Sequence, residues 1–323
     1  MRLWLVHAVI ALLAVSPVAQ AQQSQRLHRV GFIASTSPVS ELLTVNPAAR
    51  AFARGMLELG YIEGRDLVIE WRSAEGSLER TADIVRELVS MKIDVIVTVT
   101  DSMTQQAKDV TRTVPIVMAA SSKPVELGLV RSLALPGGNV TGLTMDAGPD
   151  ILGKRLQLLK ELLPGTRRVA VLGPLDERAA EMAAQTIGIK LHFVAPDPAK
   201  QYANAFASLV RPRLDAVLVA AWAPNFAYRR QIADFAARNA LPVMYPSRAY
   251  VEAGGLVSYG LDVSELFRHS ASYVGRILRG AKPADLPIER PTKFELVVNL
   301  RTAKAMGLAI PPLLLVRADE LIQ

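Results

Sequence analysis

Short, continuous apolar segments alternate with amphipathic segments along most of this chain of 323 residues. Strands that are apolar along their whole length are buried on both faces, and such strands form parallel sheets that helices cover on both sides. The segments that we interpret as strands are residues 30–34, 67–71, 94–99, 115–118, 169–172, 189–194, 216–219 and 242–244. The sequence therefore predicts an α/β fold with parallel sheets.

The strand-and-helix pattern falls into two series, and the turn at residues 136–139 separates them. Each series spans about 110–120 residues, which is an ordinary domain size. We therefore expect two Rossmann-like lobes.

The last third of the chain holds too few elements for a third core. It offers a strand at residues 256–259, a helix that Asp262 and Glu265 begin as a capping box, and a strand at residues 294–299. These pieces are expected to return to the two lobes, so that the chain crosses between them several times and forms a hinged clamp. The expected N-terminal lobe comprises residues 29–141 and about 260–290, and the C-terminal lobe residues 142–257 and about 291–323.

The N-terminus has the pattern of an export signal. An apolar run at residues 3–15 follows Met1 and Arg2, and Ala19-Gln20-Ala21 fits a small-x-small cleavage site. We predict a cleaved signal peptide at residues 1–21; the alternative is an N-terminal anchor helix. Because the chain has no cysteine, we expect neither disulfides nor a lipid anchor, and we predict a periplasmic protein.

Few residues indicate covalent or metal chemistry. The absence of cysteine excludes thiolate nucleophiles and cysteine zinc sites, and the histidines lack metal-ligand spacing. There is no G-x-S-x-G, Walker A or G-x-G-x-x-G motif. We predict no catalytic residue, metal or cofactor, and interpret the chain as a binding protein rather than an enzyme.

Small polar side chains follow several predicted strands of the first lobe. Ligands of open α/β sheets gather at the carboxyl ends of strands, where hydroxyls and helix N-termini can hold a polar head group. Helix capping is the alternative role for the same residue types. The predicted ligand-binding residues here are Ser35, Thr36, Thr100, Asp101, Ser121, Ser122 and Lys123.

Larger side chains follow the predicted strands of the second lobe. Trp222 and Tyr245 would supply an apolar wall and Arg248 a partner for a carboxylate, while Tyr259 lies on a strand that leads to a crossing. Packing within the lobe is the alternative for Tyr245. We predict that Trp222, Tyr245, Arg248 and Tyr259 complete the site.

Three segments resemble one family. PGGNVTGL at residues 136–143, VEAGGLVSYG at residues 251–260, and PTKFELVVNL at residues 291–300 with Ile310-Pro311-Pro312 are similar to the ABC-transporter substrate-binding proteins of the tryptophan/tyrosine-binding-like family. The resemblance runs from about residue 29 to residue 322. It implies the type 1 periplasmic-binding-protein fold with three crossings, and a protein that captures a small solute and delivers it to an ABC permease.

One departure from the family pattern bears on the ligand. Relatives often carry aspartate where this chain has Lys123, and this exchange favours an anionic ligand unless Lys123 is a solvated helix start. We therefore expect an amino-acid-like compound or an organic acid, without carrying tryptophan or tyrosine over from the family.

Two other functions remain open: an exported enzyme on this scaffold, and the ligand-sensing domain of a chemoreceptor or sensor system. The net charge of +7 raises the question of nucleic acid, but no concentrated run of lysine and arginine accompanies it. We expect no nucleic-acid partner, and a monomer.

Overall fold

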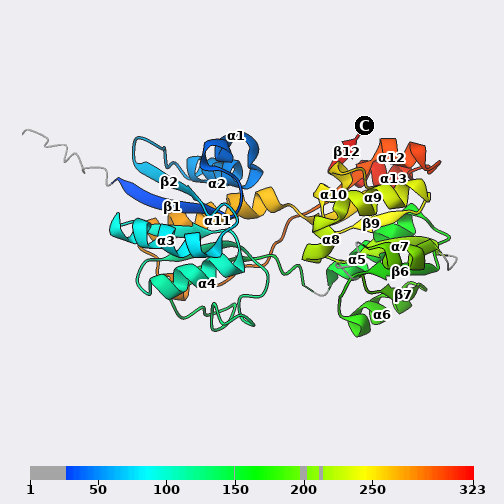
Figure 1. Ribbon diagram of the computed structural model, residues 1–323, viewed down its shortest axis with the longest axis horizontal. Helices are drawn as coiled ribbons and strands as arrows, with labels where there is room; N and C mark the ends of the chain where they lie inside the picture. The colour runs from blue at the N-terminus through cyan, green and yellow to red at the C-terminus, as the bar shows by residue number, and fades with distance from the viewer. Residues whose placement is uncertain (1–26, 149, 197–201, 211–213) are drawn as a thin grey trace, which may run out of the picture.

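The computed structural model describes residues 27–148, 150–196, 202–210 and 214–323. It forms two lobes that lie side by side along the long axis of the molecule (Figure 1). The predicted signal peptide falls outside the described residues.

The first lobe is built on a five-stranded sheet whose order is β2-β1-β3-β4-β5 and whose strands all run parallel. The helices of this lobe are α1 (Leu42–Val45), α2 (Pro47–Glu58), α3 (Leu78–Ser90), α4 (Asp101–Val110) and α11 (Val263–Leu278). Its strands are β1 (His28–Ala34), β2 (Leu67–Ser73), β3 (Val95–Thr98), β4 (Ile116–Ser121) and β5 (Val140–Thr144).

The second lobe is built on a seven-stranded sheet in the order β12-β11-β10-β9-β8-β6-β7. Only the β10–β11 pair is antiparallel among the described strands. The strands are β6 (Arg168–Leu172), β7 (Lys190–Val194), β8 (Ala216–Val219), β9 (Val243–Tyr245), β10 (Val257–Leu261), β11 (Phe294–Asn299) and β12 (Glu320–Ile322). The helices are α5 (Asp150–Leu162), α6 (Glu177–Thr186), α7 (Ala203–Val210), α8 (Ala223–Ala227), α9 (Arg229–Arg238), α10 (Arg248–Glu252), α12 (Leu300–Ala305) and α13 (Pro312–Arg317). This architecture confirms the predicted α/β fold class.

The chain passes between the lobes three times: from β5 to α5, from β10 to α11, and from the 3₁₀ turn Pro283–Asp285 to β11. The third passage runs beside β5, because Thr144 N donates to the Glu289 carbonyl at 3.0 Å. All five residues of β5 belong to the first sheet, so the expected boundary between residues 141 and 142 falls inside a strand.

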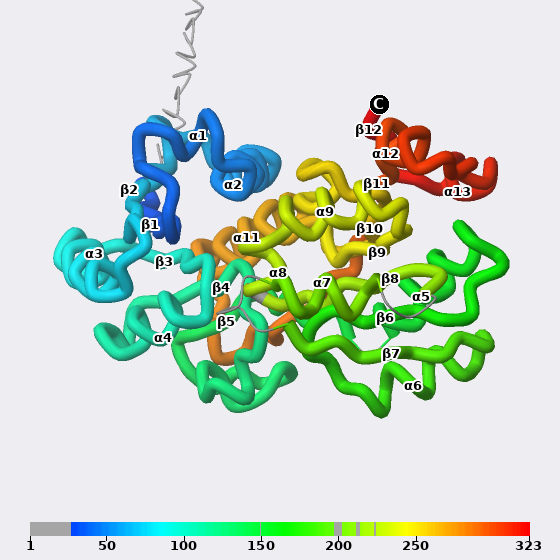
Figure 2. Tube along the Cα trace, turned by 45° about the vertical axis from the view of Figure 1, so that its right-hand side comes forward, coloured from blue at the N-terminus to red at the C-terminus, as the bar shows by residue number. Residues whose placement is uncertain are grey.

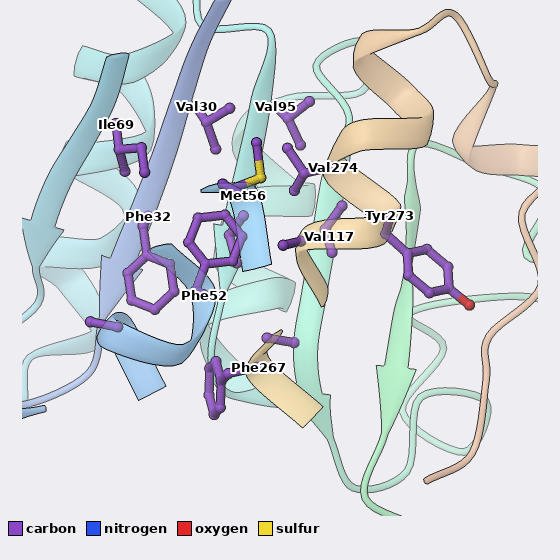
Figure 3. Close-up of a cluster of buried hydrophobic side chains, with 14 of the residues drawn as sticks. Val30, Phe32, Phe52, Met56, Ile69, Val95, Val117, Phe267, Tyr273 and Val274 are labelled. Atoms are coloured by element: carbon purple, nitrogen blue, oxygen red, sulfur yellow. The ribbon is translucent and has the colours of Figure 1, made fainter. Parts of the chain in front are cut away.

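Helix α11 is encoded after most of the second lobe but lies in the core of the first. Its Phe267 and Val274 are buried with Phe32 and Phe52, and the Phe32 and Phe267 ring centroids are 6.4 Å apart (Figure 3). A surface helix that covers a sheet buries one apolar stripe, and α11 places that stripe over β3, β4 and β5.

Local capping fixes where α2 and α11 begin. Asn46 Oδ1 accepts hydrogen bonds from the backbone amides of Ala48 and Ala49 at 3.0 and 3.1 Å, and Pro47 is the first helical residue. Asp262 caps α11 by accepting from Glu265 N at 2.9 Å. The Glu265 side chain does not close the predicted capping box, because Arg268 binds its carboxylate.

No helix within residues 27–148, 150–196, 202–210 and 214–323 combines the length and the apolar character that spanning a membrane requires.

Candidate functional site

A cavity of about 470 Å³ lies between the two lobes. The first lobe contributes residues that follow β4 and β5, the second lobe contributes Ala221 after β8, and the third passage contributes Arg290. Helix α8, which follows Ala221, lies on the side of its lobe that faces the first lobe in both views (Figures 1 and 2). Because the cavity has walls from both lobes and from the connections, it is the candidate ligand site.

A compact polar cluster of Asp101, Ser121 and Ser122 borders the first-lobe wall, and Ser122 is its member that lines the cavity. The Asp101 carboxylate accepts hydrogen bonds from both serine hydroxyls, and also from Ser122 N at 3.0 and 3.2 Å. Ser121 is fully buried, whereas Ser122 is exposed and lines the cavity. The structure thus brings together three of the residues that the sequence analysis singled out at the ends of β3 and β4.

Lys123 also lines the cavity, but its charge is not free. Its ammonium donates to Glu126 Oε2 at 2.8 Å, and this hydrogen bond raises the pKa of the lysine. Both side chains are exposed. The structure therefore favours a solvated, paired Lys123 over a lysine that offers an unpaired cation to a ligand.

Of the remaining predicted residues of the first lobe, one caps a helix and two have hydroxyls without a hydrogen bond in the described structure. Thr100 is the N-cap of α4, and its hydroxyl accepts from Met103 N at 3.3 Å, so the capping alternative holds for it. Ser35 and Thr36 follow β1, and within the described part of the chain their hydroxyls form no hydrogen bond. Neither lines the cavity.

In the second lobe, Trp222 occupies the N-cap position of α8 and is partly exposed. It directly follows Ala221, which lines the cavity, but Trp222 itself is not among the lining residues. The sequence reasoning missed what fixes this turn: the buried Asn225 donates to the carbonyls of Leu172 and Ala220 at 2.9 and 3.0 Å and accepts from the Tyr202 hydroxyl at 2.7 Å. A buried amide that satisfies strand-end carbonyls holds the loop in one geometry.

Tyr245 is not a cleft residue. Its side chain is fully buried in the second-lobe core and stacks on Tyr250 with 5.2 Å between the ring centroids. Burial raises the pKa of its hydroxyl well above the ordinary value, and in the described structure this hydroxyl lacks a hydrogen-bond partner. Tyr245 is therefore not part of the predicted apolar wall. Its ring gains more free energy from complete burial in the core than from partial burial at the edge of the cleft.

Arg248 is likewise not a free anchor for a carboxylate ligand. Its guanidinium binds Glu295 at 2.7 Å and Glu320 at 2.5 Å, so it joins the start of α10 to β11 and β12. The hydrogen bond to Glu295 is the main reason that the pKa of Arg248 is raised. The two glutamates come from distant parts of the sequence, which is why the arginine looked available in the sequence alone.

Tyr259 packs on the second-lobe core and stacks on Phe294, with 5.8 Å between ring centroids. Its backbone carbonyl accepts from Arg155 Nε at 2.7 Å, and Arg155 Nη2 reaches the Pro246 carbonyl at 3.3 Å. Arg155 is buried, and desolvation lowers its pKa to about 10. The site analysis of the sequence missed Arg155, which ties α5 to the ends of β9 and β10.

Gly260 is required beside this contact. A Cβ at this position would lie 1.9 Å from the Pro246 carbonyl oxygen, so a larger residue would push β10 away from the end of β9. The second passage between the lobes starts immediately after this point.

Ion pairs connect the third passage to the first passage and to helix α11. Arg290 binds Asp146 at 2.9 Å, which joins the third passage to the first. Glu289 binds His269 at 2.8 Å and Arg276 at 3.4 Å, which joins the third passage to α11. Any relative motion of the lobes must therefore either move these ion pairs together with the connecting segments or break them.

A surface depression of about 940 Å³ lies elsewhere, at the amino-terminal ends of β6 and β7 beside Arg168, Lys190 and Asp215. Its lining comes from the second lobe alone. In the part of the chain that the structure describes, no group of three or more His, Asp or Glu side chains is placed to hold a metal ion.

Comparison with known proteins identifies similar chains. The family described as ABC transporter substrate binding protein matches residues 44–322. A tyrosine-binding protein of Clostridioides difficile (strain R20291) is 25% identical over 279 residues, which cover 84% of this chain and 80% of that protein.

Solved structures share the fold. An ABC domain from Streptococcus pneumoniae in complex with L-Trp has a TM-score of 0.74 at 23% identity, covering 91% of this chain and 99% of that one. The ligand-free, open structure of a substrate binding protein with adhesive properties from Clostridium difficile has a TM-score of 0.76 at 23% identity, covering 92% and 99%.

Proposed function

Because the chain belongs to the ABC transporter substrate-binding protein family, we propose that it holds a small organic solute in the cavity between its lobes and delivers it to an ABC permease. The observation that carries the proposal is the position of the cavity, whose walls come from both lobes and from the connecting segments. A ligand that contacts both walls stabilises the closed arrangement, because those contacts exist only when the lobes approach.

The ligand class that we propose is an amino acid or a related compound with an apolar side chain. Two relatives support this class, since one is named for binding tyrosine and the other was solved with L-Trp. The polar groups at Ser122 and Asp101 would receive the head group, and Trp222 at the start of α8 would face the apolar part. Ser35 and Thr36, at the end of β1, would contact the ligand only in the closed state.

The cellular setting follows from the same proposal. Removal of residues 1–21 would release the protein into the periplasm without a lipid anchor, where it would act as a monomer. Members of this family are binding proteins, and we propose that this chain binds its solute without chemical change.

Isothermal titration of the processed protein with L-tyrosine, L-tryptophan, L-leucine and L-glutamate tests the proposal. We expect saturable one-to-one binding of at least one of the apolar amino acids, with the bound compound recovered unaltered. Absence of binding by L-tyrosine, L-tryptophan and L-leucine would contradict the ligand class, whether or not L-glutamate binds, and recovery of a converted product would show an enzyme.

Trp222→Ala tests the second-lobe wall. We expect a loss of affinity of at least about tenfold, since removing an aromatic ring that packs on a ligand costs 1–3 kcal/mol or more. Leu313→Ala is the matched control, because Leu313 is 64% exposed on α13 and does not line the cavity. Equal affinities for the two variants would exclude Trp222 from the site.

A further inference from the structure

Resting on the proposed function, we propose that the Asp101–Ser121–Ser122 cluster makes the first-lobe wall a subsite for a hydrogen-bond-donating, cationic head group, an ammonium, rather than for a carboxylate. The inference reverses the expectation that Lys123 gave from the sequence.

The direction of the hydrogen bonds in the cluster carries the proposal. A carboxylate only accepts hydrogen bonds, whereas a serine hydroxyl has one hydrogen to donate and lone pairs that accept. Because the hydroxyls of Ser121 and Ser122 both contact the Asp101 carboxylate, each must donate its single hydrogen to it. What Ser122 can still offer to the cavity is its lone pairs.

The polar hydrogens nearest the Ser122 hydroxyl are used in the same way. Ser122 N donates to Asp101, and the Thr144 hydroxyl donates to the Ser121 carbonyl at 2.9 Å. Met145 N donates to the same carbonyl at 2.6 Å. A carboxylate ligand beside the Ser122 hydroxyl would therefore meet an oxygen whose hydrogen is already used, while an ammonium there would meet an acceptor.

The charge of the lining agrees with this polarity. The two cations on the cavity wall are paired: Lys123 with Glu126 at 2.8 Å, and Arg290 with Asp146 at 2.9 Å. These pairs cancel, and Asp101 forms no ion pair with any residue in the described ranges. The N-terminus of α4 stabilises the aspartate charge but leaves a net negative group behind Ser122.

Ser121 is a positioning residue in this arrangement. It is fully buried, so its hydroxyl binds the Asp101 carboxylate from the protein interior, while the Ser122 hydroxyl binds the same carboxylate from the cavity side. A fixed carboxylate keeps the Ser122 hydrogen directed away from the ligand, which makes the preference for a donor independent of side-chain rotation.

The test compares matched probes that keep only one end of an amino acid. Titrations of the processed protein use L-tyrosine, tyramine and 3-(4-hydroxyphenyl)propionate, and in parallel L-leucine, isoamylamine and 4-methylpentanoate. We expect the amine of each series to bind at least about tenfold more tightly than its acid, because a hydrogen bond to a charged group is worth at least that much. In each series the acid must be the weakest ligand.

Asp101→Asn assigns the effect to the cluster. The amide keeps the shape and one acceptor oxygen but donates from its nitrogen to Ser122, which frees the serine hydrogen to point into the cavity. We expect this variant to lose at least about tenfold in affinity for the amines and to gain affinity for the acids. Asp109→Asn, on the exposed end of the same helix, is the matched control and should leave both affinities unchanged.

Three outcomes decide the matter. An amine preference that Asp101→Asn removes supports the inference. Acids that bind as tightly as amines, or an amine preference that survives in a folded Asp101→Asn variant, overturn the inference and leave the proposed function standing. If no amino acid, amine or acid binds, the proposed function fails and the inference fails with it.

Discussion

The two walls of the cleft behave differently when sequence and structure are compared. At the end of β4 in the first lobe, small polar residues stay where the strand pattern puts them, and Ser122 reaches the cavity. At the end of β9 in the second lobe, Tyr245 is buried in the core and Arg248 is held by two glutamates. A small hydroxyl gains little free energy from burial in the core. A large ring, in contrast, packs into a nearby apolar layer, and a guanidinium binds a nearby carboxylate.

The largest expected effect comes from Tyr245→Ala, which empties a fully buried aromatic position. We expect the free energy of unfolding to fall by about 3–5 kcal/mol, measured by urea titration, with ligand affinity unchanged in the folded protein. Tyr245→Phe is the control: it keeps the ring and removes a hydroxyl that has no partner within the described structure, so stability should stay equal or rise. A loss of affinity in Tyr245→Phe without loss of stability would return Tyr245 to the cleft.

Arg248→Ala should have the next largest effect, and again on stability rather than on binding. Glu295 is 9% exposed and would lose its guanidinium partner, which we expect to cost about 1–3 kcal/mol in the free energy of unfolding. The comparison variant is Arg86→Ala, whose partner Asp83 is highly exposed, and this change should stay within about 0.5 kcal/mol. If titration showed that Arg248→Ala abolishes binding at unchanged stability, Arg248 would be a ligand anchor after all.

The smallest effect concerns pH and the arginine bridge of the first lobe, in which Arg268 joins Glu265 of α11 to Glu58 of α2. The hydrogen bond from Arg268 lowers the pKa of Glu265 in the folded state, so its contribution is present above the ordinary glutamate pKa of about 4.3 and is lost as the pH falls through the folded value.

Thermal unfolding between pH 7 and pH 3 tests this dependence. We expect Glu265→Gln to remove up to about 1 kcal/mol of the acid-induced loss of stability, since a half-exposed pair is worth little more. Glu63→Gln, at an exposed position without an ion pair among the described residues, should follow the unmodified protein. Identical pH profiles for all three proteins would exclude the bridge.

The fold was predictable because burial on both faces leaves a continuous apolar run, as at β3 and β8, and this signal is local. The short strand β12 was not predicted, because three residues at the end of the chain pair with β11 only after the sheet exists. At the site, Asp101, Ser121 and Ser122 could be named from the sequence because they follow predicted strands, but the hydrogen bonds that join them could not be predicted. The partners of Arg248 and the position of Arg155 could not be predicted either, since both depend on contacts between segments that are far apart in the sequence.

The return of α11 to the first lobe also sets the order in which the chain can become native. Until residue 278 has been synthesised, the five-stranded sheet lacks the helix that supplies Phe267 and Val274 to its core. The face of the first-lobe sheet that α11 covers therefore stays exposed while most of the second lobe is synthesised. This delay is compatible with the export that the sequence predicts, because a polypeptide that cannot finish folding early remains extended enough to be threaded across a membrane.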